Sequence, residues 1–117
     1  MGPVDFSILE QFKELMGDEG EDEVKDLVTL YLEDAPNQIR AMKYALSGSN
    51  AEDFQRAAHS FKSSSANIGA FGLQTICLEL ETMGKENSLG EPTRELISKA
   101  ESEFASVQTA LNGFLSS

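Results

Sequence analysis

The only histidine of the chain, His59, has the clearest capacity for chemistry, and Lys62 follows it three residues later. Residues three apart in a helix lie on the same side, so the lysine ammonium would reach a group bound to the imidazole. A neutral imidazole nitrogen is a nucleophile, and a nearby ammonium can pair with an anionic group transferred to it. Phosphate fits this pair best. The alternative is that Lys62 only adds solubility, or pairs with a carboxylate of another helix such as Glu79 or Glu81.

The orientation of His59 follows from the phase of its helix, at about 100° per residue. On the side opposite His59, at roughly 160° to 220°, four apolar residues gather: Phe54, Ala57, Phe61 and Ile68. Because an apolar side faces the core, His59 is predicted to face solvent.

The face that carries His59 also carries small residues, Ser63, Ala66 and Ala70, where a solvated helix usually has long polar side chains. These short side chains would let another protein approach the imidazole closely. The alternative is that serine and alanine are merely acceptable helix residues.

The rest of the chain is predicted to form the helices that position this face. Glycine and proline divide it into helical lengths, and no segment shows the alternating pattern of a strand. We expect helices at about residues 5–16, 21–46 with a bend near Pro36, 51–70 with Asn50 as its cap, 73–84, and 93–114 after a loop at 88–92. The predicted class is all-α, an antiparallel up-and-down four-helix bundle with an additional short N-terminal helix.

Length and charge restrict the remaining possibilities. The 117 residues fit one domain spanning 1–117, in which residues 1–3 are set aside as an expected cloning remnant. A formal net charge of -11 argues against nucleic acid and anionic lipid as partners. The sequence lacks a signal peptide, a membrane span, a Gly-rich phosphate loop and the spacing of a calcium loop. We therefore expect a cytoplasmic domain without a metal or cofactor, in which the single cysteine, Cys77, is a buried packing residue.

Residues 58–70, AHSFKSSSANIGA, resemble the signature of the histidine-containing phosphotransfer (HPt) domain. That signature is His, any residue, an apolar residue, Lys, Gly or Ser, Ser, Ser, and then Gly-Ala a few residues on. The resemblance extends along almost the whole chain. The chain is similar to the C-terminal modules of hybrid sensor histidine kinases.

The resemblance implies a role for each matching residue. His59 would be the phosphoryl acceptor and donor, and Lys62 would stabilise the phosphate. The surface around them would bind partners through Gln55, Arg56, Ser63, Ala66, Asn67 and Ala70. Ser64, Ser65 and Gly69 would be structural. Some family members have a glutamine on the following helix beside the phosphate, and here Gln74 and Glu81 are only neighbours in the right region.

The implied function is that of a monomeric phosphocarrier in a multistep phosphorelay. It would accept a phosphoryl group from a receiver-domain aspartate onto His59 and pass it to another receiver, with response-regulator receivers and a hybrid sensor histidine kinase as partners. Mg²⁺ would be needed only in the receiver, and the chain would have no kinase activity of its own. The alternative is a helical interaction module that docks on a kinase or receiver and inhibits it without being phosphorylated.

Overall fold

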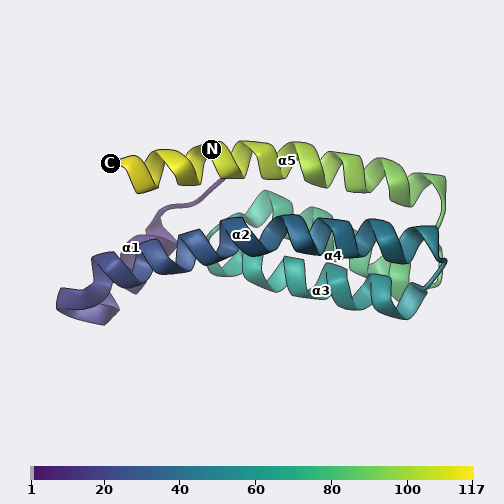
Figure 1. Cartoon of the computed structure of the whole chain (residues 1–117), viewed down its shortest axis with the longest axis horizontal. Coiled ribbons are helices and arrows are strands. Elements are labelled where there is room, and N and C mark those ends of the chain that lie inside the picture. The colour runs from purple at the N-terminus through teal and green to yellow at the C-terminus, as the bar shows by residue number, and fades with distance from the viewer. Residues whose placement is uncertain (1) are drawn as a thin grey trace.

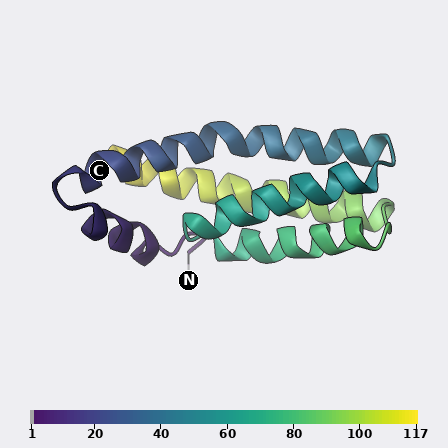
Figure 2. The same ribbon diagram turned by 90° about the horizontal axis from the view of Figure 1, so that it is seen from below.

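The computed structural model describes residues 2–117, which form helices and no strand. The helices are α1 (Ser7–Met16), α2 (Gly20–Ser47), α3 (Ala51–Asn67), α4 (Phe71–Lys85) and α5 (Glu91–Ser116), with a 3-10 turn, η1 (Gly17–Glu19), between the first two. Helices α2 to α5 run side by side in alternating directions, and α1 packs beside the N-terminal end of α2 (Figures 1 and 2). The predicted all-α bundle is confirmed. Met1, part of the predicted cloning remnant, lies outside the described residues.

The ends of α3 are set by two local motifs. The side chain of Asn50 accepts a hydrogen bond from the Asp53 amide at 3.0 Å, so the predicted cap is present. At the other end the Gly69 amide donates to Ala66 at 3.1 Å and the Ala70 amide donates to Ser65 at 2.9 Å. This is the bonding pattern of a Schellman motif, in which Gly69 has the positive φ of +85° that ends the helix. The predicted third helix was therefore too long, because α3 ends at Asn67.

Two prolines lie within helices. Helix α2 is continuous across Pro36. Pro92 was predicted to belong to a loop but occupies the first turn of α5, where the missing amide hydrogen would have no helical partner in any case.

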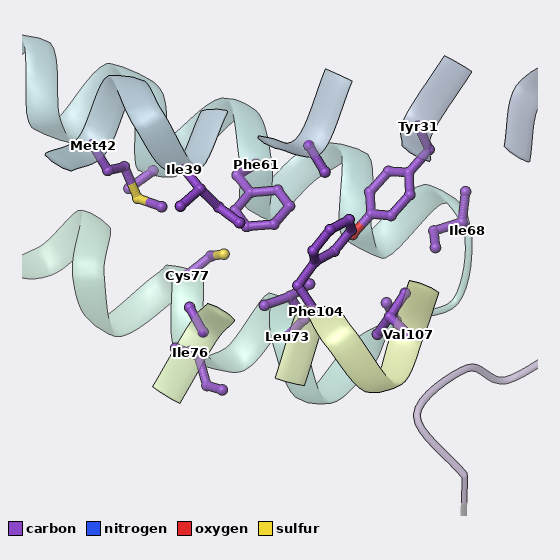
Figure 3. Close-up of a cluster of buried hydrophobic side chains, with 14 of the residues drawn as sticks. Tyr31, Ile39, Met42, Phe61, Ile68, Leu73, Ile76, Cys77, Phe104 and Val107 are labelled. Carbon is purple, nitrogen blue, oxygen red and sulfur yellow. The ribbon is translucent and has the colours of Figure 1, made fainter. Parts of the chain in front are cut away.

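An aromatic cluster joins three helices at the centre of the core (Figure 3). Tyr31 of α2, Phe61 of α3 and Phe104 of α5 have ring centroids 6.1 to 6.4 Å apart. The Tyr31 hydroxyl shares a 2.9 Å hydrogen bond with the hydroxyl of Ser65, so the one polar group of the cluster is satisfied. Cys77 is also fully buried, as predicted.

Helix α4 packs closely against α3 at Gly84. A Cβ atom on Gly84 would lie 2.9 Å from the Cβ of Gln55 and 3.0 Å from its backbone nitrogen. The absence of a side chain at Gly84 thus permits the spacing of the two helices one turn away from Glu81. No helix among residues 2–117 is long and apolar enough to cross a membrane.

Replacing Gly84 by alanine tests this spacing. We expect Gly84→Ala to lower the free energy of unfolding by about 1 to 3 kcal/mol, because the added methyl group overpacks the interface with α3. Gly113→Ala is the matched control, since nothing lies within 4 Å of a Cβ atom there. It should raise the stability by up to about 1 kcal/mol through helix propensity. Urea denaturation measures both, and equal effects of the two changes would contradict the close contact at Gly84.

Candidate functional site

His59 lies in the middle of α3 with 59% of its side chain exposed. The four apolar residues predicted to lie opposite it are all buried: Phe54, Ala57, Phe61 and Ile68. The prediction that His59 faces solvent is confirmed.

A buried carboxylate from the neighbouring helix holds the imidazole. Glu81 of α4 is only 3% exposed, and its Oε2 lies 2.7 Å from Nδ1 of His59. Its other oxygen, Oε1, accepts a hydrogen bond from Nζ of Lys62 at 2.6 Å. Both carboxylate oxygens are thus satisfied, and His59 and Lys62 are joined through Glu81.

The charge state of Glu81 follows from these contacts. Burial alone would raise the pKa of the Glu81 carboxyl, because it disfavours the charged form, but the hydrogen bonds from Lys62 and His59 outweigh it and lower that pKa below its ordinary value. Glu81 is therefore ionised near neutral pH, and an ionised carboxylate can only accept hydrogen bonds.

A polar depression of about 500 Å³ adjoins the imidazole. Its lining residues come from one side of α3 and the adjoining part of α4: Glu52, Gln55, Arg56, His59, Glu81 and Lys85. Arg56 is exposed and pairs with Glu52 at 3.1 Å and with Asp53 at 3.4 Å. An anionic group on His59 would lie on the surface that carries Lys62, Arg56 and Lys85.

The predicted partner-binding residues separate into two groups. Five of them lie at or partly at the surface of α3: Gln55, Arg56, Ser63, Ala66 and Asn67. Ala70 is 0% exposed, so its prediction as a partner-binding residue was wrong. The prediction applied the helical phase of α3 to Ala70. However, α3 ends three residues earlier, at Asn67, and the chain then turns into α4.

The three residues predicted to be structural all make contacts within the fold. Ser64 donates to the Phe61 carbonyl at 3.2 Å, and Ser65 is the partner of Tyr31 in the core. Gly69 accepts a hydrogen bond from the Asp5 amide at 2.8 Å, and a Cβ atom on Gly69 would lie 2.4 Å from the Asp5 carbonyl oxygen. The N-terminal segment is thereby attached to the turn between α3 and α4.

Sequence reasoning missed the importance of Glu81, which it considered as a possible partner of Lys62 and as a neighbour of the phosphate site, but not as a partner of His59. A signal was present, because Glu81 follows the buried Cys77 by four residues and so lies near the inward side of α4. It also missed Leu78, which lies three residues before Glu81 and is 50% exposed.

The lowered pKa of Glu81 predicts a pH dependence of stability. A carboxyl whose pKa is lower in the folded state contributes stability that is present above its ordinary pKa, near 4.5, and is lost as the pH falls further through the folded-state value. The stability difference between the unaltered chain and Glu81→Gln should therefore shrink below about pH 4.5. Urea denaturation across this range measures the difference, and a difference that stays constant would contradict the paired carboxylate.

Comparisons with known proteins show the family to which the chain belongs. The family model described as Hpt domain matches residues 26–112. The crystal structure of histidine-containing phosphotransfer protein B (HptB) from Pseudomonas aeruginosa PAO1 is similar, with a TM-score of 0.89 and 31% identity over 97% of this chain and 95% of that one. A rice protein provisionally described as a histidine-containing phosphotransfer protein has the same fold, with a TM-score of 0.84 and 21% identity over 98% of this chain and 81% of that one. The search of curated proteins gave no match. The chain belongs to the Hpt domain family and is a histidine phosphotransfer protein of phosphorelays.

Proposed function

We propose that this chain carries a phosphoryl group on His59 from the aspartate of one receiver domain to that of another. The observation that supports this most is the state of the imidazole: Nδ1 is bound to Glu81, and His59 makes no other side-chain hydrogen bond within residues 2–117. The second ring nitrogen, Nε2, is therefore left for a reaction on an exposed surface.

The transfer requires one bond to form and one to break. The lone pair of Nε2 attacks the phosphorus atom of an aspartyl phosphate in line with the bond to the aspartate oxygen. The N–P bond forms, the P–O bond breaks, and its electron pair stays on the receiver carboxylate. The reverse reaction, with a different receiver, transfers the phosphoryl group from Nε2 of His59 to the aspartate of that receiver. Mg²⁺ and the acidic residues that hold it would belong to the receiver, so this chain would act as a carrier without kinase activity or a cofactor of its own.

Lys62 is the residue that we propose to stabilise the bound phosphate. Its ammonium has three N–H donors, of which one is directed at Glu81. With 22% of the side chain exposed, the ammonium can offer its remaining donors to a phosphoryl oxygen while it stays bound to Glu81.

The receiver would dock over the exposed part of α3 and α4. Towards the C-terminal end of α3 the surface is low, because Ser63, Ala66 and Asn67 are short. Leu78 of α4 adds exposed apolar area, while Gln55 and Arg56 form the polar side of the same surface. We propose that a receiver binds this surface in the cytoplasm, with the chain acting as a monomer.

The first test is transfer of label to His59. Incubation with a radiolabelled, phosphorylated receiver should give an acid-labile, alkali-stable product, as expected for phosphohistidine, and His59→Gln should give none. Label that persists in the variant would contradict the proposal. If no receiver of the source organism transfers label, the chain would instead be an unphosphorylated interaction module.

The second test separates docking from chemistry. Ala66→Arg should slow transfer from a receiver by about 10-fold or more, because a long charged side chain in the low part of the surface obstructs a close partner. Phosphorylation by phosphoramidate, a donor small enough to need no docking, should be unchanged. Ala105→Arg, on the exposed side of α5, is the matched control and should leave both rates unchanged. Equal slowing with both donors would argue against a docking role for Ala66.

A further inference from the structure

The two sides of the His59 ring have different neighbours on α3. With His59 taken as zero and about 100° per residue, Lys62 lies at about −60°, on the side of α4, where it bonds to Glu81. Arg56 lies at about +60° on the same scale, on the side of α2, where it lines a groove together with Tyr44 of that helix. The ring thus has one cation of α3 on each side.

The contact with Glu81 turns the reactive nitrogen toward the side of Arg56. In an imidazole ring, Nδ1 and Nε2 lie on opposite sides of the line that runs outward from Cγ. Nδ1 of His59 lies 2.7 Å from Glu81 on α4, so Nε2 is turned toward α2. A phosphoryl group on Nε2 would therefore extend over the side of α3 that carries Arg56.

The position of the ring along α3 also matches Arg56. Helical side chains lean toward the N-terminus, so each one covers the surface over the turn that precedes it. The turn before His59 carries Gln55 and Arg56, and both line the polar depression beside the imidazole. Arg56 is thus near Nε2 both around the helix and along it.

The present partners of Arg56 are carboxylates of its own helix, Glu52 at 3.1 Å and Asp53 at 3.4 Å. The side chains of Arg56 and Glu52 are 69% and 82% exposed, and ion pairs so exposed to water stabilise a protein little. A phosphoryl group carries more charge than a carboxylate, has three acceptor oxygens, and matches the planar fork of a guanidinium. Arg56 can therefore leave its present partners for a phosphoryl group.

We propose that Arg56 is a phosphoryl-binding residue, which exchanges Glu52 and Asp53 for the phosphoryl oxygens when His59 is phosphorylated. This inference rests on the proposed function and extends it, because it gives Arg56 a role in the phosphorylated state besides docking. Lys62 and Arg56 would then contact the phosphoryl group from the two sides of the ring.

The consequence is a longer-lived phosphohistidine. As the N–P bond breaks, the phosphoryl group passes through a metaphosphate-like transition state, in which its oxygens carry less negative charge than in the bound group. A guanidinium on these oxygens stabilises the bound group more than the transition state. Loss of the phosphoryl group to water therefore slows.

Hydrolysis measures this effect without any receiver. After phosphorylation by phosphoramidate and removal of the donor, the half-life of phosphohistidine in Arg56→Gln should be shorter by about 3- to 10-fold, because the amide carries no charge. Arg56→Lys should be intermediate, since an ammonium keeps the charge but lacks the planar fork. Arg94→Gln is the matched control and should leave the half-life unchanged. Arg94 is an exposed arginine near the start of α5 that pairs with Glu91, three residues earlier, at 3.1 Å.

Glu52 provides a test of opposite sign. Because Glu52 competes with the phosphoryl group for Arg56, Glu52→Gln should lengthen the half-life. In the double variant with Arg56→Gln, the change at Glu52 should have no effect, since no guanidinium is left to compete for. An equal lengthening in both backgrounds would mean that Glu52 acts only through its charge, and would contradict the exchange of partners.

The exchange can also be observed at the guanidinium itself. The chain has three arginines, Arg40, Arg56 and Arg94, so nitrogen-15 labelling gives three side-chain Nε–H signals. Phosphorylation by phosphoramidate should shift the signal of Arg56 and leave the other two in place. A role for Arg56 only in stabilising the start of α3 predicts no such shift.

Two results would overturn the inference: a half-life in Arg56→Gln equal to that of the unaltered chain, or an Arg56 signal that does not move on phosphorylation. The proposed function fails separately, if no receiver transfers label to His59. The half-life and the NMR signal do not depend on that result, because phosphoramidate replaces the receiver as the donor.

Discussion

The surface of this protein around His59 depends on one buried carboxylate. A charge removed from water is unfavourable unless hydrogen bonds and opposite charge compensate it, and Glu81 has a donor at each oxygen. Both donors come from α3, whereas the carboxylate comes from α4. The pair of helices is therefore held in one register by the same contacts that hold the imidazole.

The packing of α3 against α4 is arranged to permit these contacts. Gly84 lets α4 approach Gln55 without a side chain between the helices, and Gly69 turns the chain sharply from α3 into α4. On the inner side of α3, Phe61 and Ser65 are fixed in the core by Tyr31 and Phe104. Helix α3 therefore has one side packed in the core and one exposed side, and His59 lies on the exposed side.

This arrangement suits a carrier that shares its chemistry with a partner. The chain exposes one nucleophile among short side chains, with cations of Lys62, Arg56 and Lys85 nearby. In the proposed function, the receiver supplies the metal and the leaving group, and this chain supplies the nucleophile and the contacts that orient it. His59 lies on an exposed helix surface and not in a closed pocket, which the proposed transfer between two receivers requires.

The sequence by itself determined what is local to one helix. Periodicity predicted the buried side of α3 and the exposure of His59, because the angle between two residues depends only on their separation within a continuous helix. The resemblance to the HPt domain added the family and the expected role of His59. The same reasoning failed at Ala70, since the phase has no meaning beyond the end of the helix at Asn67. Only the tertiary structure showed Glu81 between His59 and Lys62, because the register of α4 against α3 is set by packing across the bundle and not by the spacing of residues along the chain.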